Sequence, residues 1–394
     1  MTATETRIQL LSDNSILDKS CSLFALLLLF TLPIRDAFFV IESPVVTIGF
    51  VVGVIFGSVW LIRAVMHGQF QFSLKFHGIF FALTLWSGIS ILWAADIGQV
   101  ISRTVSYFYI LATLVALYDT YSRKNSVSPL LQAYVLGASI LVISTLSVFF
   151  ADPTANWRRL AGFGYNPNKM GTVVTLGVPL AYYLIRNQFG PVLLKIVNGL
   201  YIPSAILTVS LTGSRGSMVA LSFILLGMLV DSLYSLGMRG KLYIFAGTLT
   251  GIWITVSMLP ERTASYIMTI PELAVSVDLG SRERAWQSTM EVFMTRPLLG
   301  VGADNVSVIS ETGVSAHSLF FFMLGNHGLV GFGLFLLLIA YLCQMIFDEY
   351  MDTGSWLVFL LGWVMLNLFN DFGMVISFVL LNIIAIDGRQ SIDM

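Results

Sequence analysis

Long apolar stretches separated by short polar turns run through nearly the whole chain. The hydrocarbon core of a bilayer is about 30 Å thick, and a helix crosses it with about 20 apolar residues. By that measure we predict twelve spans, some of them short. They cover 18–34, 45–66, 77–94, 100–118, 129–150, 170–186, 192–211, 216–235, 242–259, 318–347, 355–370 and 372–387.

The stretch 318–347 is too long for one simple crossing. We expect the sequence GNHG (325–328) to break it, because glycine flanks a polar pair there. The break would leave a short amphipathic start followed by a full span. We expect His327, which lies inside the break, to have a structural role.

Composition supports a membrane protein. Apolar residues make up 56% of the chain and charged residues 11%, which excludes an ordinary soluble domain. We therefore predict an all-α polytopic fold in which 1–394 form a single integral membrane domain. The only two cysteines, Cys21 and Cys343, lie in apolar stretches and indicate neither a disulfide framework nor a zinc site. The apolar run 21–34 is expected to be a retained first span rather than a signal peptide.

Short basic loops predict the orientation. RKNS (123–126), the turn Arg186–Lys195 and MRGK (238–241) alternate with nearly uncharged turns. Short loops rich in lysine and arginine stay in the cytoplasm, so both termini are expected there. The two longest loops, 151–169 and 260–317, then fall outside.

Arginine dominates the outer side of this arrangement. Nine of the ten basic residues placed outside are arginine, against six of the eleven placed inside. A guanidinium fork binds phosphate through two parallel hydrogen bonds, whereas lysine acts as a point charge. The preference indicates an external substrate that carries phosphate. The alternative is that long loops simply do not follow the positive-inside rule.

The segment AHSLFFFMLGNHGLVG (316–331) places His317 and Ser318 at the start of a long apolar run. A histidine at a membrane surface can take a proton near neutral pH, so His317 is a candidate general base. The alternative is a capping or interfacial histidine. Ser315 is a candidate helix cap, and Ser318 lies in the first turn, where free backbone amides favour anions.

Two arginine motifs are candidates for phosphate binding. In TGSRG (212–216), a tight turn flanked by glycines presents Arg215, and the alternative is an ordinary hairpin with a solvated arginine. In SRERAW (281–286), Arg282 and Trp286 share one face of an expected short helix. A cation beside an aromatic ring suits a sugar phosphate, and the alternative is a solvated amphipathic helix.

A third motif, NWRRLAGFGYNPNKMG (156–171), carries Arg158, Arg159 and Asn168. The arginines are candidates for a phosphate clamp and the asparagine for contact with sugar hydroxyls. The alternative is a capped helix start. No Asp-x-Asp metal motif, Walker loop or Gly-x-Ser-x-Gly elbow occurs in the sequence. We therefore expect no metal and no cofactor, and nothing suggests a nucleic-acid partner.

Taken together, these motifs resemble a known family. His317-Ser318, nine residues and Gly328-x-x-Gly331 are similar to the signature His-[Asn/Ser/Gln]-x9-Gly-x-x-[Gly/Thr/Tyr] of bacterial O-antigen ligases. Other landmarks of the ligase and polymerase superfamily are similar to NPN (166–168), SRG (214–216), SRERAW (281–286) and RPLLGVG (296–302). The resemblance covers roughly 155–335.

The resemblance implies a fold of the lipid-dependent glycosyltransferase type (GT-C-like) with about twelve spans in the bacterial inner membrane. The loop 260–317 would be a large periplasmic loop. The resemblance also implies metal-independent, inverting glycosyl transfer on the periplasmic face. The donor would be a glycan on undecaprenyl pyrophosphate and the acceptor a sugar hydroxyl of lipid A-core, with membrane lipids around both.

Four residues match functional positions of that family. His317 matches the base, Arg215 the arginine of the turn, and Arg282 the arginine of the loop. Arg159 is a further match for pyrophosphate binding, although Arg158 beside it fits equally well. Two other functions stay open. An O-antigen or exopolysaccharide polymerase would use the same donor, and a flippase for lipid-linked oligosaccharides would instead need charge lining a central cavity.

Overall fold

The computed structural model describes residues 16–35, 47–152, 159–235, a few isolated positions up to 257, 281–311, 313, 316–347, 351–369 and 374–393. Eleven of the twelve predicted spans coincide with helices, and the twelfth, 242–259, lies almost entirely outside the described residues. The α-helices are α2 (Ile16–Ile34), α3 (Ile48–His67), α4 (Leu74–Ile89), α5 (Ile97–Tyr121), α6 (Ser128–Ala151), α7 (Pro167–Arg186), α8 (Val192–Thr212), α9 (Arg215–Ser235), α12 (Ser281–Thr295), α13 (Val306–Ile309), α14 (Leu319–Ile346), α15 (Thr353–Phe369) and α16 (Met374–Asp393), and the short 3₁₀ turns are η1 (Ser90–Leu92) and η2 (Gly162–Gly164).

Span-length helices confirm a polytopic helical membrane protein. Within the described residues, eight helices are long and apolar enough to cross a bilayer. The helices α7, α15 and α16 are not among the eight. α15 is apolar but shorter, and α7 is surrounded by protein, since every residue from Met170 to Leu184 is buried. The expected number of twelve crossings and the GT-C-like architecture stay predictions.

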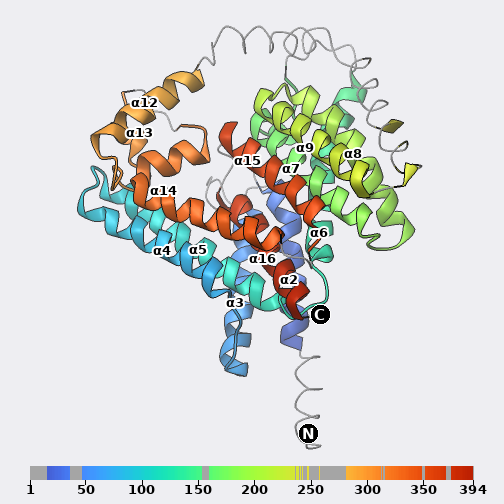
Figure 1. Cartoon of the computed structure of the whole chain (residues 1–394), viewed down its shortest axis with the longest axis horizontal. Coiled ribbons are helices and arrows are strands. Elements are labelled where there is room, and N and C mark those ends of the chain that lie inside the picture. Colours follow the sequence, from blue (N-terminus) through green and yellow to red (C-terminus); the bar gives the residue numbers. More distant parts are fainter. Residues whose placement is uncertain are drawn as a thin grey trace, which may run out of the picture.

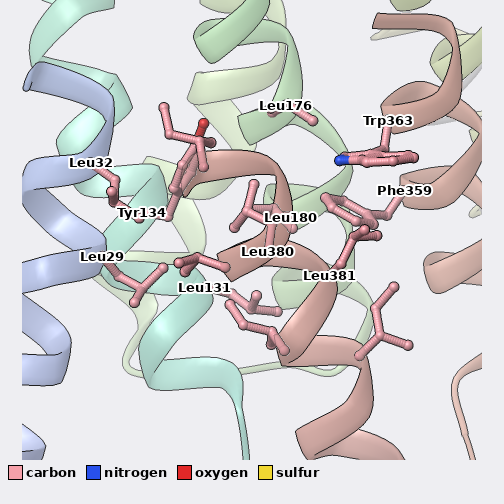
Figure 2. Close-up of a cluster of buried hydrophobic side chains, with 14 of the residues drawn as sticks. Leu29, Leu32, Leu131, Tyr134, Leu176, Leu180, Phe359, Trp363, Leu380 and Leu381 are labelled. Carbon is pink, nitrogen blue, oxygen red and sulfur yellow. The ribbon is translucent and has the colours of Figure 1, made fainter. Parts of the chain in front are cut away.

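The most buried helices are α7, which packs against α6, α8, α9 and α15, and α16, which packs against α5 and α14. Figure 2 shows the core, where Leu131 and Tyr134 of α6 lie between α2 and these two helices, and Trp363 lies on the α15 side. In lipid, burying apolar surface between helices gains little, so close packing and small residues hold such a bundle together. Gly137 illustrates this, because a Cβ there would lie 2.0 Å from the carbonyl oxygen of Phe30.

Successive helices alternate in direction, which gives the bundle two ends (Figure 1). We call the end at which α5, α9 and α14 begin the histidine end, and the end at which they finish the ion-pair end. Two arginine clusters lie at the ion-pair end. Arg63 pairs with Asp18 and with Asp119. Arg186 pairs with Asp231 and Asp352.

Candidate functional site

His317 occupies an exposed turn directly before α14. Its backbone φ is 48°, in the left-handed region that residues other than glycine seldom adopt. Such a conformation costs on the order of 1–3 kcal/mol and persists only where the surrounding structure holds it. The fold therefore presents this imidazole at the histidine end on a turn that needs support from its neighbours.

The residue before the histidine is held by α12. The indole Nε1 of Trp286 donates a hydrogen bond to the carbonyl oxygen of Ala316, at 2.9 Å. The same indole ring stacks on Phe321, with 5.1 Å between ring centroids and 8° between the planes. The sequence predicted that Trp286 would contact a sugar. That contact stays a prediction, and the structure shows its N–H and one ring face supporting the histidine turn.

The residue after the histidine is held by α15. Ser318 is fully buried, and its hydroxyl donates to the carbonyl oxygen of Asn367, at 3.2 Å. Ser318 was a weaker candidate for substrate binding, and its side chain joins α14 to α15. His317 thus stands between two anchored neighbours. Ser315, the predicted cap, lies outside the described residues.

The predicted break in α14 is confirmed at Gly328, whose φ of 63° and ψ of −168° are not helical. A break frees backbone groups that must find partners inside a membrane protein. The carbonyl oxygens of Gly325 and Asn326 accept hydrogen bonds from the amides of Val301, at 3.2 Å, and Gly302, at 3.0 Å. The RPLLGVG loop therefore satisfies the carbonyls just before the break.

The same loop also satisfies the other side of the break. The amides of Leu329 and Val330 donate to the carbonyl oxygens of Pro297, at 2.8 Å, and Leu298, at 3.2 Å. Loop and helix thus exchange four main-chain hydrogen bonds, an arrangement that we call the interlock (297–302 with 325–330). Because buried main-chain groups are costly to leave unpaired, each segment requires the other.

Glycine is required on both sides of the interlock. A Cβ on Gly328 would lie 2.3 Å from the amide nitrogen of Gly300, and a Cβ on Gly300 would lie 2.4 Å from the carbonyl oxygen of Asn326. A Cβ on Gly331 would lie 2.3 Å from the Cβ of His327. The Gly-x-x-Gly step is therefore explained by close backbone approach and packing.

The spacing of the signature also has a physical reason. The nine residues 319–327 form a short helix about 13 Å long, at a rise of 1.5 Å per residue. Its C-terminal end is fixed by the interlock, and His317 lies just before its N-terminal end. His327, at the C-terminal end, is buried and contacts the hydroxyl of Tyr107 through Nε2, at 3.2 Å, which supports the structural role expected for it.

A second group of predicted residues meets at the start of α7. The Nε of Arg159 donates to the carbonyl oxygen of Thr212, at 3.0 Å, and its Nη2 donates to the side-chain oxygen of Asn168. Thr212 is the last residue of α8, where carbonyl groups carry partial negative charge that suits a cation. The structure thus brings two predicted motifs together, the asparagine-rich segment and the TGSRG turn. Arg158 lies outside the described residues.

The capped helix start that was the alternative for this segment is also present. The side-chain oxygen of Asn166 accepts hydrogen bonds from the amides of Asn168, at 2.9 Å, and Lys169, at 3.3 Å. This N-cap fixes the first turn of α7. Asn168 therefore lies on a rigid helix start, where its side chain contacts Arg159.

The predicted tight turn at TGSRG is confirmed. Gly213 ends α8 with a φ of 58°, and α9 begins at Arg215, which is half-buried. Behind the turn, the hydroxyl of Ser217 lies 2.9 Å from that of Ser214 and 3.3 Å from that of Thr172. These hydroxyls join α7 and α9, so the position of Arg215 is set by the bundle rather than by a mobile loop.

The C-terminal end of α15 lies between the histidine and the arginine groups. α9 and α15 run antiparallel, and a Cβ on Gly362 would lie 2.5 Å from side-chain atoms of Ile224. Continuing that register brings Arg215 to the end of α15. On its other side, the same end contacts Ser318 through Asn367. Figure 1 shows α15 between α14 and α9.

The short helix expected at SRERAW is confirmed as α12, which packs on α14. Arg282 is half-buried in its first turn. It lies four residues before Trp286 and therefore on the same helix face. Since Trp286 contacts Ala316, this face is directed toward the histidine turn, and Arg282 lies one helical turn further along it.

Sequence reasoning missed the role of Arg103. Its Nη2 pairs with a carboxylate oxygen of Asp304, at 2.6 Å, and its guanidinium lies 5.1 Å from the ring centroid of Phe322. The group ties α5 and the segment after the interlock loop to the short helix below His317. A signal was present, because an arginine two turns inside an apolar span requires a partner.

Apolar span-length helices around a polar histidine end define a multi-pass helical membrane protein. Residues 201–336 match the family model described as O-antigen ligase. That range includes the TGSRG turn, α12, the interlock and the histidine turn. Over that range, this match confirms the resemblance to O-antigen ligases drawn from the motifs. Arg159 and Asn168 lie before the matched range. No curated protein matches the chain.

Proposed function

We propose that this protein is an O-antigen ligase. It transfers a glycan from undecaprenyl pyrophosphate to a sugar hydroxyl of lipid A-core, without a metal and with inversion at the anomeric carbon. The reaction takes place at the histidine end, which faces the periplasm, and both termini lie in the cytoplasm. The family match over 201–336 and the geometry of the histidine end support this function.

His317 acts as the general base in this proposal. As the acceptor hydroxyl attacks the anomeric carbon, a ring nitrogen of the imidazole takes the hydroxyl proton. A new bond forms between the acceptor oxygen and the anomeric carbon, and the bond from that carbon to the pyrophosphate oxygen breaks. The exposed, anchored turn suits this task, because the imidazole can reach a large acceptor without losing its position.

The arginines stabilise the leaving group. Negative charge grows on the bridging oxygen of the pyrophosphate as the glycosidic bond breaks, and fixed cations placed there lower the barrier. Arg215 and Arg282 are the main candidates, from opposite sides of the end of α15. Arg159 is a third candidate, because its hydrogen bonds to Thr212 and Asn168 hold its guanidinium at the start of α7. The polyprenyl tail would lie against apolar helix faces in the membrane.

One observation carries the proposal. Helices far apart in sequence bring an exposed histidine and arginines of three motifs to the same end of the bundle. Hydrogen bonds of buried hydroxyl groups hold the histidine turn and the TGSRG turn on either side of α15. A base and a group of guanidinium forks are what transfer from a lipid-linked pyrophosphate requires.

The test is a transfer reaction with purified protein in detergent. The donor is an undecaprenyl-pyrophosphate glycan with a radiolabelled sugar, the acceptor is lipid A-core, and excess EDTA is present throughout. We expect the label to move onto lipid A-core and His317→Ala to stop it. Longer lipid-linked chains without labelled lipid A-core would instead identify a polymerase. Transfer that requires added magnesium or manganese would contradict the metal-independent mechanism.

A further inference from the structure

A groove runs along the outside of the bundle between α4 and α14, in the half toward the ion-pair end. Small residues make it concave, with Gly78 and Ala82 on α4, and Leu337 forms part of the opposite wall on α14. Built from apolar and small side chains, it faces the region that lipid chains occupy around a membrane protein.

One end of the groove is polar. The ammonium group of Lys75 lies over the ring of Tyr341, 5.7 Å from its centroid, and Gln344 lies beside them. Among the described residues, every ion pair is made by an arginine, and no carboxylate pairs with Lys75. The exposed ammonium group of Lys75 thus lies at one end of the apolar groove.

The dimensions fit one lipid. From Ala82 to Lys75 the groove extends about 10 Å, at 1.5 Å per residue. One leaflet contributes about half of the 30 Å hydrocarbon core. A chain in the groove would therefore run from the headgroup level toward the bilayer centre. A lysine at headgroup level attracts anionic lipids.

We propose that this groove binds one anionic glycerophospholipid of the leaflet at the ion-pair end. Its phosphate contacts Lys75, the polar groups of Tyr341 and Gln344 accept or donate at the headgroup, and one acyl chain lies along Gly78 and Ala82. The site is separate from the histidine end, so it does not depend on the proposed function.

The test is native mass spectrometry of the purified full chain, titrated with phosphatidylglycerol or phosphatidylcholine of identical acyl chains. We expect tighter binding of phosphatidylglycerol to the wild type. Lys75→Gln should weaken that binding by about fivefold, the factor for one lysine near an anionic headgroup, while Lys75→Arg retains it. Gly78→Leu should fill the channel and remove both lipids.

Matched controls use positions away from the groove. Lys124→Gln changes an exposed lysine at the same end, and Gly199→Leu on α8 adds a side chain where a Cβ meets nothing within 4 Å. Both should bind lipid like the wild type. Millimolar inorganic phosphate should not compete, since the chain contributes to binding. The proposal is overturned if Lys75→Gln keeps full phosphatidylglycerol binding, if Gly78→Leu behaves like Gly199→Leu, or if phosphate displaces the lipid.

Discussion

Arg186 and Arg159, which lie at opposite ends of the bundle, are held by different kinds of group. At the ion-pair end, Arg186 pairs with Asp231 across two helices, so its charge is compensated within the protein. At the histidine end, Arg159 donates to the carbonyl of Thr212 and the amide of Asn168. These two acceptors are neutral groups, and they fix the direction of the guanidinium.

This difference distinguishes a structural role for an arginine from a role in binding phosphate. A paired carboxylate neutralises its arginine, and removing one partner of the pair lowers the stability of the protein. An arginine positioned by neutral groups keeps its electrostatic attraction for an incoming phosphate. The ion pairs of Arg186 therefore suit holding helices together, whereas we propose that Arg159 contacts an anionic substrate.

The largest effect is expected when the two exposed histidines, His317 and His67, are compared. His317→Ala should lower single-turnover transfer by about 10²–10⁴-fold, the usual contribution of a general base, while donor binding stays intact. His67→Ala, at the ion-pair end, should transfer at the wild-type rate. Equal activity of His317→Ala and wild type, at matched protein levels, would remove the base from the mechanism.

The next effect concerns the interlock. Gly328→Ala places a Cβ 2.3 Å from the amide nitrogen of Gly300 at a φ of 63°. Strain and overlap together should cost about 3 kcal/mol of stability, and transfer should fall because the histidine turn shifts. Gly333→Ala on the same helix should be silent. Thermal unfolding in detergent measures both, and an unchanged Tm for Gly328→Ala would contradict the interlock.

A smaller effect is expected when arginine becomes lysine at each end. Arg159→Lys keeps the charge but loses the planar fork, so transfer should fall about tenfold, in line with one hydrogen bond to a charged group. Arg186→Lys should transfer normally and unfold at a lower temperature, because the loss there is structural. If Arg159→Lys and Arg186→Lys change the transfer rate and the unfolding temperature equally, the two arginines do not have different roles.

The smallest effect is expected at the support of the histidine turn. Trp286→Phe keeps an aromatic ring on Phe321 but removes the N–H that donates to Ala316. One such hydrogen bond contributes about 0.5–1.5 kcal/mol, so kcat should fall two- to tenfold while KM for the donor stays unchanged. A rise in KM with constant kcat would instead indicate direct contact of Trp286 with the donor sugar.

Much of the fold could be predicted because its signals are local. Apolar length gave eleven of the helices, and glycine beside polar residues gave the break at Gly328 and the turn at Gly213. The partners of those features could not be predicted. Nothing periodic in 297–302 indicates that its main chain completes the break in α14, or that Asp304 pairs with Arg103.

The candidate site shows the same limit. Residue types indicated Arg159 and Asn168 as ligands, but only the fold shows that they contact each other. Residue types also indicated Ser318 and Trp286, whose polar groups are used to hold the histidine turn. The chemistry of a side chain can be inferred from the sequence. The group that it contacts depends on how distant segments pack together.

The central claim is that His317 lies at an external site that binds the lipid-linked donor. It is tested most directly by His317→Cys in a background lacking Cys21 and Cys343, with Lys124→Cys as the control at the ion-pair end. We predict that an impermeant maleimide labels His317→Cys in intact spheroplasts and Lys124→Cys only after lysis. In purified protein, undecaprenyl-pyrophosphate glycan should slow labelling at 317 alone. Labelling of His317→Cys only after lysis, or at a rate that the donor does not change, would contradict the account.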